Sequence, residues 1–269
     1  MKPAAFDYER PETVSAAVKL LHDTGGSAKI LAGGQSLGPM LNMRLVNPKL
    51  LIDIARVSEL NDISDDGDAL IFGACVTHAA IEDRMVPDAS GGMMPAVARG
   101  IAYRAVRNKG TIGGSLAHAD PAADWITTLT ALGSQALVSG PQGERTISLD
   151  QFFRSAFHTV LTDDEILIAI RVPKLSKNAR WGFYKFCRKS GEFAETMSAI
   201  VVDPERSVTR VVIGATNSRP IIVSNADKLI SVPKMINDVI AESKLVDDSY
   251  EVQAHRVSFW RALQQVLPE

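Results

Sequence analysis

Residues 111–125 read "TIGGSLAHADPAADW", and this stretch decides how the fold of the chain is interpreted. Two adjacent glycines are followed by a serine, and an Asp-Pro pair then opens a predicted helix. Asp120 is expected to cap that helix, with Pro121 at its first position. Glycine lacks a Cβ atom, so the backbone at Gly113 and Gly114 can approach another group closely. We therefore ask which group approaches the backbone at these two glycines.

A second loop of the same kind occurs at residues 32–40, "AGGQSLGPM", directly after the apolar residues "KIL". Amide groups of such loops can point inward at an anion, and Ser36 and Ser115 add hydroxyl donors. A helix that begins near Pro121 would aim its positive end at the same anion. Neither loop matches the dinucleotide fingerprint or the P-loop, so spacing alone predicts no more than a phosphate cradle.

Composition excludes several other classes of protein. The 269 residues suggest more than one subdomain. The net charge of -2 argues against nucleic acid as a partner. No apolar run reaches the roughly 20 residues of a membrane span, and the first residues lack a signal-peptide core. Cys75 and Cys187 are too few for a disulfide framework or an iron–sulfur site, which favours a cytoplasmic location.

Periodicity predicts an α+β protein. The first fifty or so residues show a helix followed by two short strands, which is a small α/β unit. Turn residues inside residues 60–76 and 134–149 predict hairpins, and "EILIAIRVP" at residues 165–173 predicts a strand. Residues 106–119 are expected to be irregular. Three consecutive strands and several helices are expected beyond a boundary near residue 175.

Two segments together resemble one known family. They are "LAGGQSLGPMLNMRLVNPKLLIDI" (31–54) and "VRNKGTIGGSLAHADPAADW" (106–125), and the likeness extends to residues 163–173 and 182–202. The chain resembles the FAD-binding medium subunit of molybdenum hydroxylases. That family includes the medium subunits of aerobic carbon monoxide dehydrogenase and the FAD domain of xanthine dehydrogenase.

The resemblance implies a three-part fold. A two-subdomain FAD-binding fold of the vanillyl-alcohol-oxidase (PCMH-like) type is followed by a C-terminal three-stranded antiparallel sheet with a helical bundle. We place the units at residues 1–55 (α/β), 56–175 (α+β) and 176–269.

The resemblance also implies which residues contact FAD. The backbone amides of Ala32–Ser36 and Thr111–Ser115 would wrap the diphosphate, so that valine at Gly33 or Gly113 would fill its space. Asp124 would accept hydrogen bonds from the ribose or ribityl part. The full set is Ala32, Gly33, Gly34, Gln35, Ser36, Leu37, Ile101, Thr111, Ile112, Gly113, Gly114, Ser115, His118, Asp124, Leu167, Lys185 and Phe193.

Several of these residues have alternative interpretations. Asp124 can complement a helix dipole, and Leu167, assigned to the flavin or adenine side, can simply be a strand core residue. Lys185, assigned near the flavin ring, can be a snorkelling surface lysine. His118 can hydrogen-bond the cofactor or cap a turn. Phe193 lies where several relatives carry a tyrosine, so it keeps a stacking face without the hydroxyl.

Basic residues also precede the second loop. Arg104, Arg107 and Lys109 can raise the local positive potential or form a solvated face. No catalytic residue and no metal ligand is predicted, and His78 and His158 are interpreted as structural.

The implied function is electron transfer by an oxidoreductase. The chain would carry FAD and pass electrons from a small [2Fe–2S] subunit to NAD, a quinone or oxygen. A large molybdenum-cofactor subunit would complete a heterotrimer, expected as a dimer of heterotrimers. Two alternatives remain: a stand-alone FAD-dependent reductase or oxidase of the same fold, and a non-catalytic scaffold subunit without FAD.

Overall fold

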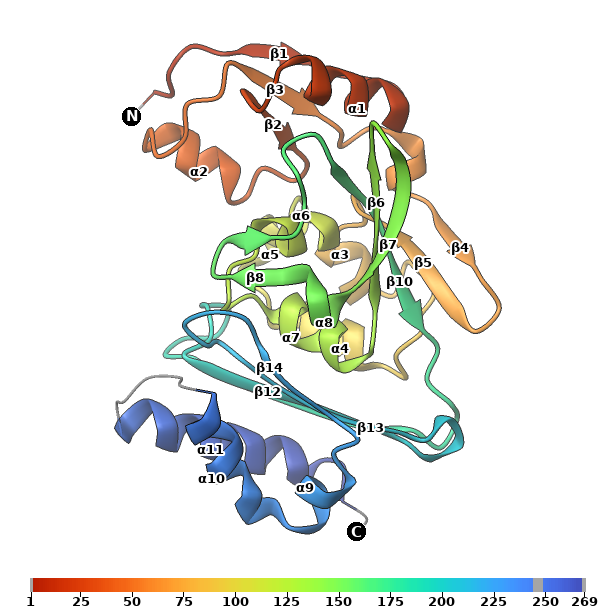
Figure 1. The fold of residues 1–269 in the computed structure, drawn as a ribbon, viewed down its shortest axis with the longest axis vertical. Coiled ribbons are helices and arrows are strands. Elements are labelled where there is room, and N and C mark those ends of the chain that lie inside the picture. The colour runs from red at the N-terminus through yellow and green to blue at the C-terminus, as the bar shows by residue number, and fades with distance from the viewer. Residues whose placement is uncertain (1, 244–248, 268–269) are drawn as a thin grey trace.

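The computed structural model describes residues 2–243 and 249–267 and shows three stacked layers (Figure 1). A small sheet lies at the N-terminal end, a five-stranded sheet with several helices forms the middle, and a four-stranded sheet with helices beneath it closes the C-terminal end. Separate buried apolar clusters fill the N-terminal, middle and C-terminal parts. The predicted α+β class is confirmed.

The N-terminal layer is a parallel sheet in the order β1-β3-β2. Thr13 begins its first helix by accepting a hydrogen bond from the Ala16 amide, and Ala17, Val18 and Leu21 are buried on one face of that helix. The predicted α/β unit is therefore present, with one short strand that the pattern did not predict. The elements are β1 (Asp7–Glu9), α1 (Val14–Asp23), β2 (Ala28–Leu31), α2 (Leu37–Asn42) and β3 (Leu50–Asp53).

The middle layer is an antiparallel sheet in the order β4-β5-β10-β6-β7. Both predicted hairpins and the predicted strand near residues 165–173 are confirmed. The strands are β4 (Ile63–Asp65), β5 (Ala69–Gly73), β6 (Gln135–Gly140), β7 (Gly143–Ser148) and β10 (Ile166–Pro173), and a short ribbon consists of β8 (Phe153–Ser155) and β9 (His158–Thr159). The helices are η1 (Ser58–Leu60), α3 (His78–Glu82), α4 (Met93–Arg99), α5 (Arg104–Arg107), α6 (Ile112–His118), α7 (Asp124–Ala131) and α8 (Leu149–Phe152).

Two local predictions in this layer were wrong. The stretch 106–119 is not irregular, because it contains α6, which Thr111 caps by accepting from the Gly114 amide. Asp120 does not cap the next helix, since α7 begins at Asp124 with Ala123 as its N-cap. The Asp120 carboxylate instead accepts a hydrogen bond from the Ala122 amide at 3.0 Å and closes the turn before the helix.

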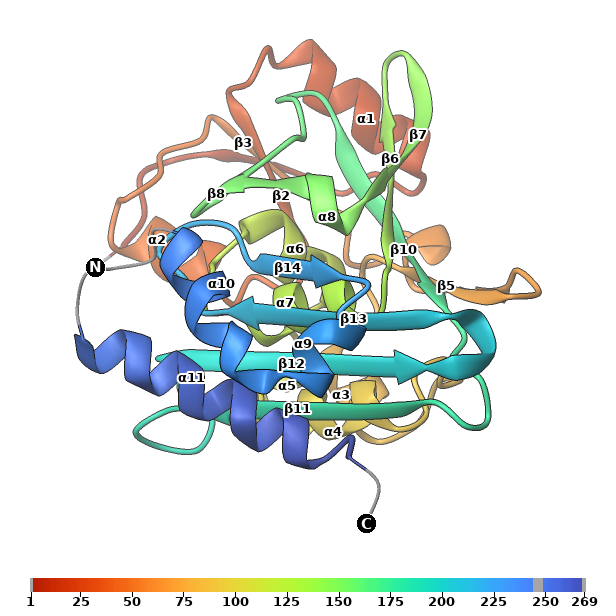
Figure 2. The ribbon, with the colours of Figure 1, turned by 60° about the horizontal axis from the view of Figure 1, so that its bottom comes forward.

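The C-terminal sheet has four antiparallel strands in the order β11-β12-β13-β14, one more than predicted. Helix α7 contacts β12 and β13 on one face, and α11 contacts β11 and β12 on the other (Figure 2). The elements are β11 (Arg180–Phe186), β12 (Thr196–Asp203), η2 (Pro204–Arg206), β13 (Val208–Gly214), β14 (Ile221–Ser224), α9 (Asp227–Ser231), η3 (Pro233–Met235), α10 (Ile236–Glu242) and α11 (Ser249–Gln264).

The residue that follows α11 forms hydrogen bonds with the free edge of strand β11. The Gln265 side chain accepts from the Phe183 amide and donates to its carbonyl, both at 3.1 Å. A Cβ atom at Gly182 would lie 2.1 Å from the Ala262 carbonyl oxygen. Helix and strand backbones therefore touch at this glycine, which protects an edge that would otherwise pair with another chain.

Replacing Gly182 with alanine is expected to lower the free energy of unfolding by about 2–3 kcal/mol, because neither backbone can move without losing the contact. Chemical denaturation of the two proteins measures this difference. Gly140→Ala is the control, since its new Cβ meets chiefly the flexible Glu165 side chain. Equal losses in the two variants would contradict the proposed backbone contact.

Candidate functional site

The two glycine loops lie against each other. A Cβ atom built on Gly33 would stand 1.9 Å from the Lys109 carbonyl oxygen and 2.9 Å from the Gly110 Cα atom. A Cβ on Gly114 would approach the Cβ of Ala32 to 3.9 Å. Residues about eighty positions apart are thus in backbone contact, and a glycine at position 33 is a steric requirement of that contact.

The first loop leaves its amide groups free. Across residues 2–243 and 249–267, nothing accepts a hydrogen bond from the backbone amides of residues 33 to 37. Gly34 adopts a positive φ of 68°, and the Gln35 side chain donates to the Gly33 carbonyl at 2.9 Å, which fixes the bend. A run of unpaired amides in such a bend is an anion-binding concavity.

The second loop uses its amides internally. Those of Ile112 and Gly113 donate to the carbonyls of Val76 and Ala74 at 3.0 and 2.9 Å. Those of Gly114 and Ser115 donate to the Thr111 side-chain and backbone oxygens. The expectation that these amides wrap a diphosphate is corrected for residues 112–115, because the helical first turn and the β5 end already satisfy them.

The role of Gly113 is corrected for the same reason. A Cβ atom there would lie 2.4 Å from the Cβ of Ala74, so this glycine allows α6 to pack on the residue that follows β5. Larger residues at Gly33 or Gly113 would therefore collide with this chain's own atoms, and not first with a bound phosphate.

A buried histidine, His78, contacts the residue just before the second loop. The His78 amide donates to the Gly110 carbonyl at 2.9 Å, and the Trp125 indole donates to His78 Nδ1 at 3.0 Å. Burial, with a smaller contribution from Arg107, lowers the pKa of His78 to about 4. The ring is therefore neutral at pH 7 and serves as a hydrogen-bond acceptor, in agreement with its structural interpretation.

Asp124 and Lys185 form a buried ion pair between α7 and β11. Lys185 Nζ lies 3.0 Å from Asp124 Oδ2, and the two side chains are 10% and 5% exposed. Lys185 is therefore not a snorkelling surface lysine. The other carboxylate oxygen, Asp124 Oδ1, is buried and receives no hydrogen bond from any described residue. Burial raises the pKa of Asp124, and Lys185 opposes that effect.

The remaining predicted residues lie in different parts of the fold. Ile101 packs partly buried against the middle core, and Phe193 is 63% exposed in the segment that links β11 to β12. Leu167 is 4% exposed and lies in the core, whereas Ile168 at the β-bulge shares a cluster with Ala32. The His118 ring lies 5.3 Å from that of Phe157.

The two arginines before the second loop are paired with carboxylates, whereas Lys109 is exposed. Arg107 and Arg104 both contact Glu82, and Arg104 also pairs with Asp83. Sequence reasoning missed Glu82, since a partner 25 positions away leaves no local pattern. It also missed Gly110, although a glycine just before the loop was a usable signal.

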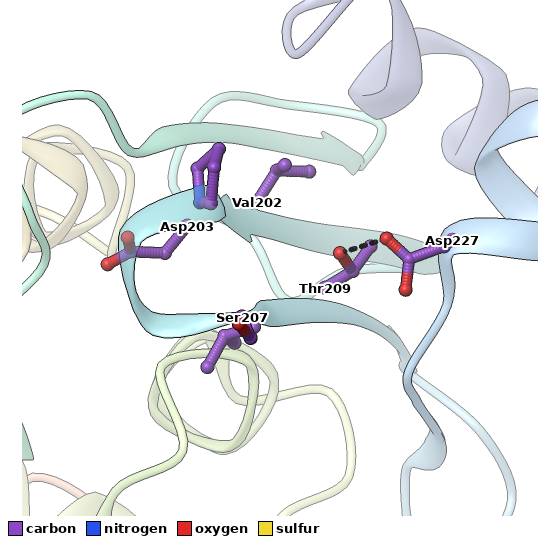
Figure 3. A pocket seen from close by; sticks show the side chains of 7 residues that line it. Val202, Asp203, Ser207, Thr209 and Asp227 are labelled. Carbon is purple, nitrogen blue, oxygen red and sulfur yellow. Dashed lines mark hydrogen bonds between the residues drawn. The ribbon is translucent and has the colours of Figure 1, made fainter.

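A separate hollow of about 290 Å³ lies on the C-terminal sheet (Figure 3). Its carboxylates are engaged: Asp203 accepts from Ser176, and Asp227 accepts from Thr209 at 2.7 Å. In the part of the chain that the structure describes, no group of His, Cys, Asp and Glu is suited to a metal ion, and no helix is long and apolar enough to cross a membrane.

The free amides beside the two contacting glycine loops are suited to an anionic cofactor, and comparison with known proteins identifies the family. The profile for the FAD binding domain in molybdopterin dehydrogenase matches residues 4–175. The chain belongs to this family and is an FAD-binding medium-type subunit of an oxidoreductase.

Comparison with individual relatives gives the same assignment. The chain is 36% identical to the carbon monoxide dehydrogenase medium chain of Hydrogenophaga pseudoflava, over 82% of this chain and 77% of the relative. It is 33% identical to the caffeine dehydrogenase subunit beta of Pseudomonas sp. (strain CBB1), over 91% and 84%. A solved carbon monoxide dehydrogenase from H. pseudoflava superposes with a TM-score of 0.90 at 30% identity, covering 99% of this chain and 98% of that one.

The residues present are suited to FAD. The free amides of residues 33 to 37 supply donors for a diphosphate, and the unpartnered Asp124 Oδ1 supplies an acceptor for a hydroxyl group. The buried, unpaired Asp124 Oδ1 is costly in a folded protein unless a ligand satisfies it, whereas the amides of residues 33 to 37 belong to partly or fully exposed residues that a ligand can reach.

Replacing Gly33 with alanine is expected to separate the loops and reduce FAD retention at least tenfold, because the new Cβ collides with backbone. Gly38→Ala is the matched control in the same segment, since its Cβ would enter open space. The ratio of flavin to protein after purification measures retention, with circular dichroism as the check on folding. Full occupancy in a folded Gly33→Ala protein would contradict the role of the loop contact.

Acid is expected to destabilise the fold partly through His78. Between pH 6.5 and about 4 the unfolded chain binds a proton at this residue and the folded chain does not. Stability therefore falls as the pH falls through this window, by about 3 kcal/mol from this group. His78→Gln should flatten the pH dependence of unfolding, whereas exposed His158→Gln should not. If the free energy of unfolding depends on pH equally in both variants and in the parent, this role of His78 is contradicted.

Proposed function

We propose that the chain carries FAD between its glycine loops and the Asp124–Lys185 pair, and passes electrons from the [2Fe–2S] clusters of a small partner to an external acceptor. The supporting observation is the run of free amides at residues 33 to 37, held open by the Gly33–Lys109 contact. Relatives named as medium chains or lettered subunits of dehydrogenases support assembly with other subunits.

At the diphosphate end, the first loop does most of the binding. Its amides donate to phosphate oxygens, with Ser36 and Leu37 completing the turn into α2. The second loop contributes its shape: Gly114 keeps the space opposite Ala32 free of side chains, and the hydroxyls of Thr111 and Ser115 remain available as donors.

At the flavin end, Asp124 and Lys185 orient the cofactor. Asp124 Oδ1 accepts a hydrogen bond from a ribityl or ribose hydroxyl, while Oδ2 stays with Lys185. The buried ammonium contributes positive charge beside the flavin, which stabilises added electron density. FAD supplies the redox chemistry when bound, and the chain supplies orientation and electrostatics. Ile101, His118, Leu167 and Phe193 complete the proposed contact set.

The wider assembly follows from the same proposal. A large molybdenum-cofactor subunit acts on the substrate, and the complex is a dimer of heterotrimers in the cytoplasm. NAD, a quinone or oxygen accepts the electrons. We also propose units at residues 1–55, 56–175 and 176–269. The end of the family match at residue 175 supports the second boundary.

Asp124→Asn is expected to weaken FAD binding about tenfold, since a hydrogen bond to a charged acceptor contributes about 1.5–3 kcal/mol. The control is Asp120→Asn, because Asp120 contacts the Ala122 amide just before the same helix and has no lysine partner among the described residues. Fluorescence titration of the apoprotein with FAD gives both dissociation constants. Equal affinity in the two variants would remove Asp124 from the site.

Purification from the native host tests the assembly. Molybdenum, iron and flavin absorbance are expected to co-elute with the chain through two chromatographic steps. A yellow chain that elutes alone and reduces or oxidises a substrate by itself would favour the stand-alone enzyme. A colourless folded chain that ignores added FAD would favour the scaffold.

A further inference from the structure

The backbone bend at residues 100–102 follows α4 and has an unusual conformation. Ala102 adopts a positive φ of 44°, which a residue with a Cβ atom rarely does. Arg107 Nη1 donates to the carbonyl oxygens of both Ile101 and Ala102, each at 2.9 Å. One guanidinium therefore holds two successive carbonyls in the orientation that the bend requires.

Arg107 is itself fixed by Glu82 of α3. Its Nε and Nη2 atoms donate to the two carboxylate oxygens at 2.7 and 3.1 Å, and both side chains are only 11% exposed. Hydrogen bonding to Arg107 lowers the pKa of Glu82, so the pair is ionised at neutral pH. A bidentate pair of this kind fixes the guanidinium plane, which a lysine cannot do.

Two parts of the proposed flavin site rest on this bend. Gly191, with a φ of 87°, lies so close that an added Cβ would stand 2.7 Å from the Ala102 carbonyl oxygen. Gly191 belongs to the segment 187–195, which carries Phe193. On the other side, the Gly100 carbonyl accepts from Lys185 Nζ at 3.4 Å. The bend thus contacts both the segment of Phe193 and the lysine that pairs with Asp124.

We infer that Arg107, held by Glu82, is a positioning residue for the flavin end of the site: it fixes the 100–102 bend, on which the Phe193 segment and Lys185 rest. It acts through Gly100 and Ala102 and does not itself contact the cofactor. The part of this inference that concerns FAD rests on the proposed function, whereas the part that concerns the segment 187–195 does not.

The chain offers a matched control in Arg104. This residue also contacts Glu82, belongs to the same short helix, and pairs with Asp83, but it has no hydrogen bond to the carbonyls of the bend. Arg104→Lys and Arg107→Lys are therefore the same chemical change at one acidic partner. They differ in whether the bend loses its donor and in burial, since the Arg104 side chain is 49% exposed and that of Arg107 is 11% exposed.

The first arm of the experiment needs no cofactor. Arg188 and Lys189 are exposed and offer trypsin two cleavage sites within the segment 187–195. In Arg107→Lys, cleavage at these sites, located by mass spectrometry, should be about tenfold faster than in the parent, because the three donors of one lysine ammonium cannot replace the four hydrogen bonds of the planar guanidinium. Arg104→Lys should cleave within twofold of the parent.

A second variant, Gly191→Ala, keeps the inference testable if Arg107→Lys fails to fold. It leaves Arg107 and Glu82 intact but places a methyl group against the Ala102 carbonyl. It should speed the same cleavage, and combining it with Arg107→Lys should add little, because both changes release one contact. Additive rates, or unchanged cleavage in Arg107→Lys, would overturn the inference.

The second arm concerns FAD. Arg107→Lys should raise the FAD dissociation constant about tenfold and shift the visible flavin spectrum and reduction potential, with Arg104→Lys unchanged. Faster cleavage with unaltered affinity, spectrum and potential would overturn the link to the flavin end. If the parent protein binds no FAD, the proposed function fails, while the trypsin comparison still decides whether Arg107 holds the segment.

Discussion

The site depends on one steric contact, that of the Gly33 backbone with the carbonyl of Lys109. A Cβ atom at position 33 would collide with that carbonyl and push the two loops apart. Among the described residues, no backbone carbonyl or side chain accepts a hydrogen bond from the amides of residues 33 to 37 beside this contact. These residues are partly or fully exposed, so their amides are available to an anion that binds in the bend.

Two buried ion pairs extend this arrangement to the C-terminal layer. Asp124 with Lys185 joins α7 to β11, and Glu82 with Arg107 fixes the bend whose Gly100 carbonyl also contacts Lys185. Buried pairs contribute little net stability, but removing one partner leaves an uncompensated charge and is strongly destabilising. The proposed flavin end is thus assembled from two layers and contains two ion pairs whose side chains are 5–11% exposed.

Sequence reasoning succeeded where the signal was local. The hairpins and the strand at residues 165–173 follow from short patterns. It failed where long-range contacts decide the conformation. Residues 112–118 form a helix because Thr111 caps it and the carbonyls of Ala74 and Val76 engage its first turn. The pairing of Glu82 with Arg107 and the fourth strand β14 likewise depend on partners distant in sequence.

Hydrogen–deuterium exchange with and without FAD tests the account most directly, since the two loops differ in whether their amides are already bonded. Adding FAD should slow exchange strongly at residues 33 to 37 and change it little at residues 112 to 115, whose amides are protected by the fold itself. Equal protection of both loops, or none at the first, would contradict the assignment of the diphosphate to the amides beside Gly33.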